Sequence, residues 1–104
     1  MTAAISEKEF QAQVLEFARL SGWRCYHTFD SHRSAPGFPD LVLVRPPVVF
    51  FAELKAEGGR ASPEQLAWLE VLGGCEGVEA RLWRPGDWPE VEEMLTRPRK
   101  RGAA

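Results

Sequence analysis

The sequence has few cysteines and no long apolar run. Cys25 and Cys75 are the only two cysteines in 104 residues, too few for a disulfide framework. No apolar stretch approaches the roughly 20 residues of a membrane-spanning helix, and the N-terminus lacks the basic and apolar regions of a signal peptide. Glycine-rich phosphate loops, serine-centred elbows and Cys/His nucleophile patterns are also missing. These absences predict a cytoplasmic protein with free thiols and no membrane contact.

Composition and charge indicate one globular domain with a basic end. Hydrophobic residues make up 44% and charged residues 27% of the chain, as in soluble domains. We predict a single domain over 1–96 and a basic, disordered tail over 97–104. Without the four basic residues of that tail, 9 basic residues face 15 acidic ones. A domain with this excess of acidic residues is not typical of a non-specific nucleic-acid binder. An acidic metal site would account for part of the excess. The tail is either a solvated end or a source of phosphate affinity.

Periodicity and capping residues predict an α/β fold in the order α-β-β-β-α-β-α. Ser6 and Glu9 form a capping box, and Ser62-Pro63 is a strong helix start. Apolar, β-branched runs bounded by turn residues indicate strands. We expect helices over 6–20, 62–73 and 87–96, and strands over 23–29, 40–45, 48–55 and 78–84. The fold class is therefore one mixed sheet flanked by helices, with a short C-terminal helix.

Two carboxylates and a lysine occupy the ends of two otherwise apolar strands. If the hairpin is symmetric about Pro46-Pro47, residues whose numbers sum to 93 lie opposite each other. Asp40 and Glu53 then become cross-strand neighbours, with Cβ atoms roughly 5 Å apart. Alternation along the strand places Lys55 on the face of Glu53, while Leu54 points away. Because proline cannot take positive φ, we expect a loop longer than a tight primed turn.

This arrangement favours a divalent-ion site over a strand-end salt bridge. Both strands are apolar on both faces, so the sheet is covered, and carboxylates are rarely buried unless they are paired or hold a metal. Mg²⁺ or Mn²⁺ would take oxygen ligands from Asp40, Glu53 and the backbone carbonyl of Leu54. The ion would make a bound water easier to deprotonate and polarise a phosphoryl oxygen. Lys55 would orient that water or offset charge on the phosphate.

Further candidates lie outside the hairpin. Glu7 and Gln11 border the core face of the first helix, so either could reach a site on the sheet. Gln65 follows the cap of the second helix, and is either an exposed polar residue or a positioning contact to the site. Arg60, in the connector before that helix, is a candidate DNA contact.

The loop before Asp40 is polar and punctuated by glycine and proline. It is either an ordinary surface loop or a phosphate-binding one, in which Ser31, Arg33 and Ser34 would contact the DNA backbone. Trp68, Trp83 and Trp88 fit packing roles better than base-stacking platforms, and a dimer interface is a further possibility.

Four motifs in order give the chain a family resemblance. They are Gly22-Trp23 after the first helix, Gly37-Phe38-Pro39-Asp40-Leu41, Glu53-Leu54-Lys55, and Ser62-Pro63-Glu64-Gln65. The chain resembles the PD-(D/E)XK nuclease superfamily, and more closely its VRR-NUC (virus-type replication-repair nuclease) branch, over residues 6–96. The bare D…ExK pattern is weak, whereas the four motifs together are fairly specific.

The resemblance implies a restriction-endonuclease-like core and a metal-dependent DNA endonuclease. It implies Mg²⁺ (with Mn²⁺ as substitute) at Asp40 and Glu53, Lys55 as catalytic lysine, and Gln65 as the family's helix glutamine. Many relatives place a glutamate on the first helix, a position that falls on Gln11 here, so Glu7 could supply the carboxylate instead.

The resemblance also implies a homodimer of phage or bacterial origin that acts on branched or structured DNA, as Holliday-junction resolvases do. Two alternatives stay open. The chain could be a DNA-binding module that has lost the chemistry, or a nuclease subunit that needs a partner.

Overall fold

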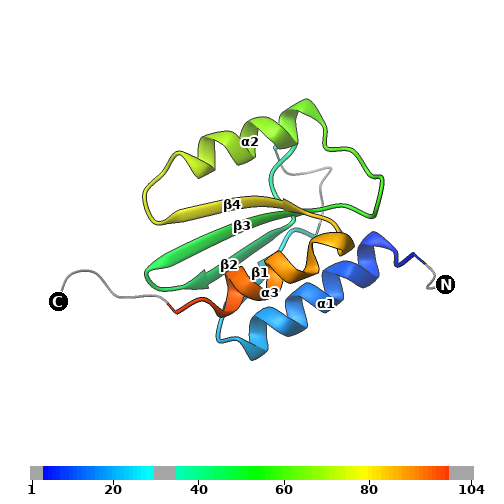
Figure 1. Ribbon diagram of the computed structural model, residues 1–104. Coiled ribbons are helices and arrows are strands. Elements are labelled where there is room, and N and C mark those ends of the chain that lie inside the picture. The colour runs from blue at the N-terminus through cyan, green and yellow to red at the C-terminus, as the bar shows by residue number, and fades with distance from the viewer. Residues whose placement is uncertain (1–3, 30–34, 99–104) are drawn as a thin grey trace.

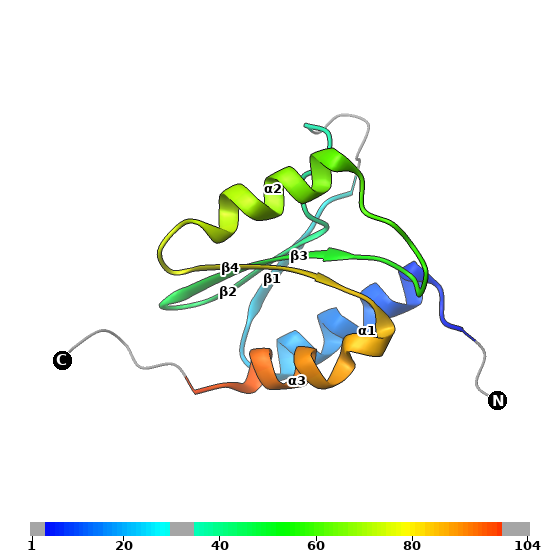
Figure 2. The same ribbon diagram turned by 45° about the horizontal axis from the view of Figure 1, so that its top comes forward.

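The chain folds into a four-stranded mixed sheet with helices on both faces (Figures 1 and 2). The computed structural model describes residues 4–29 and 35–98. The elements are α1 Glu7–Leu20, β1 Arg24–His27, β2 Leu41–Arg45, β3 Val48–Leu54, α2 Pro63–Gly73, β4 Val78–Trp83, the 3₁₀ turn η1 Pro85–Asp87 and α3 Trp88–Thr96. Their order and types confirm the predicted fold class. In both views α2 covers one face of the sheet, and α1 with α3 covers the other.

The strands lie in chain order, β1-β2-β3-β4. The first two pairings are antiparallel, and β3 pairs with β4 in parallel after a crossover through α2. Within the β2–β3 hairpin, Leu41 pairs with Ala52 and Arg45 pairs with Val48. Each of these pairs sums to 93, so the predicted register is confirmed.

The predicted loop length of this hairpin is wrong. Arg45 and Val48 are already partners, so Pro46 and Pro47 form the whole loop. The Pro46–Pro47 peptide bond is cis. Neither proline has a positive φ, so the two-residue turn is not of the primed type that proline excludes.

The fully buried core lies between the sheet and the α1/α3 layer. Its members come from α1, β2, β3, β4 and α3, with Trp23 between α1 and β1, and include Phe10, Val14, Leu43, Phe50 and Leu95. The predicted packing roles of the tryptophans are confirmed. Trp83 is buried against Phe50, and Trp88 packs edge-on against Phe17. The buried apolar core thus lies on one face of the sheet, while α2, which has no buried residue, covers the other.

Some predicted features fall outside the described residues. They are Ser31, Arg33 and Ser34, and the basic residues Arg99, Lys100 and Arg101. Within the described part of the chain, no helix has the length and apolar character needed to cross a lipid bilayer.

Candidate functional site

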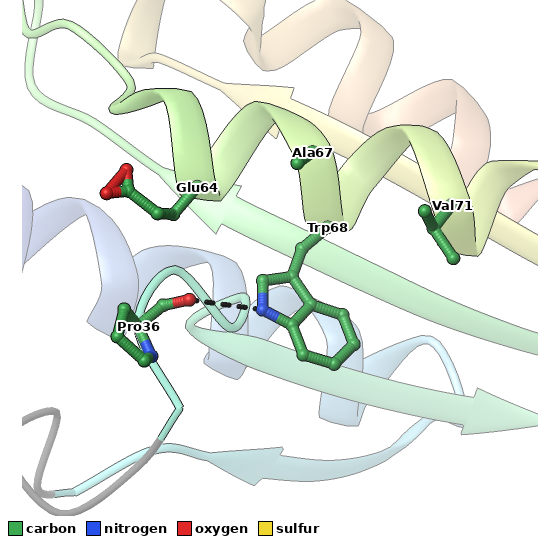
Figure 3. Close-up of a pocket in the computed structure, with 5 residues that line it drawn as sticks. All are labelled: Pro36, Glu64, Ala67, Trp68 and Val71. Carbon is green, nitrogen blue, oxygen red and sulfur yellow. Dashed lines mark hydrogen bonds between the residues drawn. The ribbon is translucent and has the colours of Figure 1, made fainter.

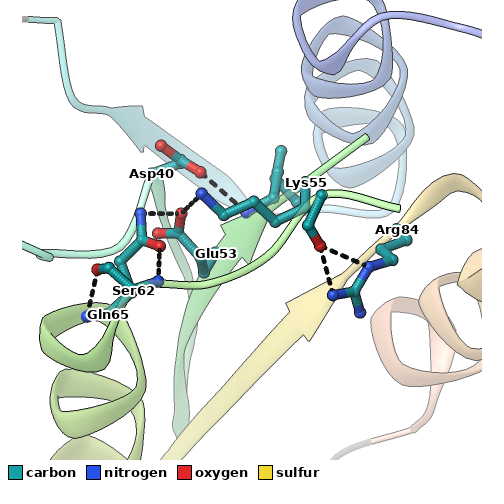
Figure 4. A network of polar contacts seen from close by, with 8 residues as sticks. Asp40, Glu53, Lys55, Ser62, Gln65 and Arg84 are labelled. Carbon is teal, nitrogen blue, oxygen red and sulfur yellow. Dashed lines mark hydrogen bonds and ion pairs between the residues drawn. The ribbon is translucent and has the colours of Figure 1, made fainter. Parts of the chain in front are cut away.

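The structure brings three predicted site residues together at the open end of the β2–β3 hairpin (Figure 4). Glu53 is almost fully buried, with 2% of its side chain exposed, and Lys55 Nζ lies 3.6 Å from Glu53 Oε2. Leu54, between them, points into the core. The predicted alternation therefore holds, and the acid and the base share one face of the sheet.

Asp40 is fixed by both strands beside it. Its Oδ2 accepts a hydrogen bond of 2.8 Å from the backbone N–H of Leu54 on β3. Its own carbonyl accepts one of 2.9 Å from Thr28, next to β1. Asp40 is one step beyond the last recorded β2–β3 pair, which places it opposite Glu53 as predicted. The carboxylate is held beside Glu53 by backbone geometry.

Gln65 joins the start of α2 to Glu53. Ser62 and Gln65 form a capping box, in which Gln65 Oε1 accepts from the Ser62 N–H at 2.8 Å. This orientation leaves the amide Nε2 to donate to Glu53 Oε2 at 2.8 Å. Gln65 is therefore a contact of the buried glutamate and not a free surface residue.

The loop before Asp40 is clamped against the first turns of α2 (Figure 3). The Trp68 indole donates to the Pro36 carbonyl at 3.1 Å, and Phe38 packs edge-on against Trp68. Gly37 has φ of 86°, and a Cβ there would lie 2.6 Å from the backbone carbon of Glu64. Only glycine fits at this approach, so the Gly37-Phe38-Pro39-Asp40 motif sets the distance between Asp40 and the Gln65 helix.

The connector between Lys55 and α2 is held by residues that sequence reasoning missed. The Arg84 guanidinium donates to the Gly59 carbonyl at 3.2 and 2.6 Å (Figure 4), and Glu57 accepts from the Gly86 N–H. No local sequence signal points to these contacts, because about 25 residues separate the partners. Arg60 is exposed on this connector.

The buried carboxylate of Glu53 carries an unpartnered oxygen. Its Oε1 is buried and has no hydrogen-bond partner among the described residues. Burial raises the pKa of Glu53 to about 8, and the neighbouring Asp40 carboxylate adds to the rise while Lys55 opposes it. Such a group is costly to ionise unless a cation comes close.

These residues fit a hard divalent ion. Two adjacent carboxylates, one with a free buried oxygen, offer oxygen donors of the kind Mg²⁺ prefers, and the Leu54 carbonyl is a further predicted ligand. Among the described residues there is no group of three or more His, Cys, Asp or Glu side chains that could hold a metal. Waters and substrate oxygens would supply the other ligands, as is usual for Mg²⁺.

The two first-helix candidates do not reach this pair through any described contact. Glu7 is exposed and Gln11 is half-buried. Neither forms a hydrogen bond or ion pair with Asp40 or Glu53 within the described residues. The third protein ligand therefore remains a prediction.

The sheet and the residues at its open hairpin end define a nuclease-type α/β domain. The family model for the VRR-NUC domain matches residues 4–84, so the chain belongs to the VRR-NUC family. A solved structure titled "VRR_NUC domain protein" shares the fold, with a TM-score of 0.65 and 20% sequence identity. That alignment covers 89% of this chain and 92% of the other. Among curated proteins, none matches the chain.

Proposed function

We propose that this protein is a Mg²⁺-dependent DNA endonuclease that hydrolyses phosphodiester bonds in branched or structured DNA. The observation that carries the proposal is the unpartnered buried oxygen of Glu53 beside a second carboxylate. A structural ion pair would leave no such oxygen, because buried polar groups are normally satisfied. Membership of the VRR-NUC family supports phosphodiester hydrolysis as the reaction at this site.

Asp40, Glu53 and the carbonyl of Leu54 would hold the ion, and Mn²⁺ would substitute for Mg²⁺. When bound, the ion lowers the pKa of a water and polarises a phosphoryl oxygen. The protein's part is to hold both carboxylates in place before the ion arrives. The Leu54 N–H orients Asp40, and the Gln65 amide binds Glu53 Oε2, which leaves Oε1 for the ligand.

Lys55 supplies the positive charge of the site. Its ammonium group lies 3.6 Å from Glu53 Oε2, and its side chain is 17% exposed. A cation there faces both the carboxylates and any phosphate that approaches them. It would offset the charge that develops on the phosphate in the transition state, or orient the attacking water. Arg60, on the adjacent connector, would contact the DNA backbone, with Ser31, Arg33 and Ser34 as further predicted contacts.

A homodimer belongs to the proposal, because a branched substrate offers two strands to two sites. Exposed apolar side chains on α2 support it. This helix has no buried residue, and its Leu66 and Val71 are 53% and 67% exposed. A helix that is apolar on every side is normally covered. If α2 joins the two copies, Leu66→Glu with Val71→Glu gives a monomer in sedimentation experiments. An unchanged mass would rule this face out.

The decisive test is cleavage of a panel of junction, flap and duplex DNAs with Mg²⁺ or Mn²⁺. We expect cutting of the structured DNAs, and its loss in Asp40→Ala, Glu53→Ala and Lys55→Ala. The proposal fails if no DNA in the panel is cut, or if these variants cut normally. Product ends and cut positions would define the substrate.

One rival function has an observation in its favour. Only two carboxylates meet at the site among the described residues, which suits a DNA-binding module that has lost the chemistry. Calorimetry with Mn²⁺ separates the two readings. Binding that disappears in Asp40→Ala and Glu53→Ala supports the nuclease, and no binding supports the module. A subunit active only with a partner would bind Mn²⁺ yet cut nothing alone.

A further inference from the structure

A small cavity opens directly beside Asp40. It has a volume of about 180 Å³, and its lining includes Thr28, Phe29, Gly37, Phe38, Asp40 and Gln65. The same loop that positions Asp40 against α2 therefore also shapes this cavity. Any strand whose phosphate lies at Asp40 and Glu53 would bring its neighbouring nucleotide to the cavity mouth.

The chemistry of the lining disfavours a phosphate. Among the described residues that line the cavity, Asp40 is the one charged residue, and it is an acid. A phosphate in contact with this part of the lining would meet a like charge. A neutral, planar group with hydrogen-bonding edges suits the cavity better, with the Thr28 hydroxyl and backbone groups as polar neighbours. A nucleobase is such a group.

Phe29 adds the feature that a base would use. Its ring is 84% exposed although it lines the cavity, and it takes no part in the core. The ring contacts His27, with centroids 4.1 Å apart and the ring planes tilted by 49°. An exposed aromatic ring beside the site offers a base a surface on which to stack.

We infer that Phe29 stacks on the nucleobase next to the scissile phosphate and that the cavity beside Asp40 receives this base. The inference rests on the proposed nuclease function and names its substrate class. A base inside a duplex is already stacked on both faces, so it can reach Phe29 only if it is unpaired or flipped. The enzyme then prefers DNA with an unpaired nucleotide at the cut, as in flaps, gaps and junctions.

The first experiment is a double-mutant cycle, in which the Phe29 ring and the DNA base are removed singly and together. Cut sites are mapped with wild-type protein on a flap DNA, and the flanking nucleotide is then replaced by an abasic one. Phe29→Ala should lower kcat/KM about 5- to 140-fold on the intact flap. On the abasic flap, wild type and Phe29→Ala should be equal. Phe29→Trp should restore cutting, and Leu20→Ala, which alters an equally exposed side chain on α1, should change nothing.

The second arm measures binding without cutting. A 2-aminopurine placed at the same position reports stacking by its fluorescence, with Ca²⁺ in place of Mg²⁺. We expect quenching by wild-type protein and its loss in Phe29→Ala. The inference is overturned if Phe29→Ala cuts the intact flap normally, or if its defect is the same on the abasic flap. If wild type quenches 2-aminopurine through Phe29 but cuts no DNA, the stacking stands and the proposed nuclease activity fails.

Discussion

The two ends of the β2–β3 hairpin differ in how their polar groups are used. At the closed end, Arg45 donates to the carbonyls of Ser21, Leu95 and Arg97 at 2.8, 3.3 and 2.7 Å, and stacks over the Trp23 ring at 4.8 Å. The three hydrogen bonds tie the C-terminal ends of α1 and α3 to the sheet. At the open end, Glu53 keeps a buried oxygen without a partner among the described residues. The closed end of the hairpin therefore stabilises the fold, whereas the open end keeps an oxygen that can bind a ligand.

The largest effect should come from neutralising the open end. Asp40→Asn keeps an oxygen for the Leu54 N–H, so the fold should survive, while the donor set loses a charge. Losing an ion that stabilises a transition state by several kcal/mol corresponds to a fall of roughly 1,000-fold in kcat/KM. Initial rates on junction DNA measure this, and the rise in Tm on adding Mn²⁺ should vanish as well. Glu64→Gln, an exposed acid on α2, is the matched control and should cut normally.

A second large effect should appear at the closed end, in stability only. Arg45→Met keeps the aliphatic stem but loses three hydrogen bonds and the stacked cation. We expect about 2–4 kcal/mol of destabilisation, or a fall in Tm of about 10–20 °C. Well below the Tm, cutting should be unchanged. If Arg45→Met is stable but cuts slowly, the two ends of the hairpin are coupled, and the closed end does not act on stability alone.

The hairpin was predictable because its contacts are local. The alternation and the two prolines determine the register, and the register alone brings Asp40, Glu53 and Lys55 together. The contacts of the second helix were only partly predictable. Leu66, Ala67, Trp68 and Leu69 follow one another in α2, so apolar side chains point in several directions around the helix. The sequence therefore does not define which face of α2 meets the sheet.

The hydrogen bonds that hold the loops around the site were not predictable either. Trp68 reaches Pro36 across 32 positions, and Arg84 reaches Gly59 across 25. Such contacts depend on how a helix and a loop sit on the sheet, which no local pattern encodes. The first-helix ligand belongs to this group too. Helical periodicity predicts that Glu7 and Gln11 border the core face of α1, but it does not give their distance from Glu53.

The third effect concerns pH and the metal-free protein. The pKa of Glu53 is raised to about 8, from an ordinary value of 4.5. The folded state therefore binds the extra proton between these two values, and stability should fall as pH rises through this window. We expect a decrease of roughly a few kcal/mol in the free energy of unfolding between pH 5 and pH 8.5. Urea unfolding with a chelator present measures it.

Glu53→Gln sharpens this third prediction. The amide cannot ionise, so most of the decrease should disappear and the variant should be more stable than wild type at pH 8.5. Addition of Mn²⁺ should stabilise wild type and not the variant. An equal pH dependence in both proteins would mean that Glu53 is ionised at little cost, and the contrast between the two hairpin ends would be lost.

The smallest effect should come from Gln65, which positions Glu53 and caps α2 at once. Gln65→Ala removes both contacts, and should cost about 1 kcal/mol of stability and about 10-fold in cutting. Gln65→Glu separates the roles, because a glutamate keeps the capping oxygen but sets a carboxylate against Glu53. We expect Gln65→Glu to hold its helix cap yet cut more slowly than Gln65→Ala, with weaker Mn²⁺ affinity in calorimetry. If both variants lose activity only in proportion to stability, Gln65 serves the helix alone, and the open end is less organised for binding than its geometry indicates.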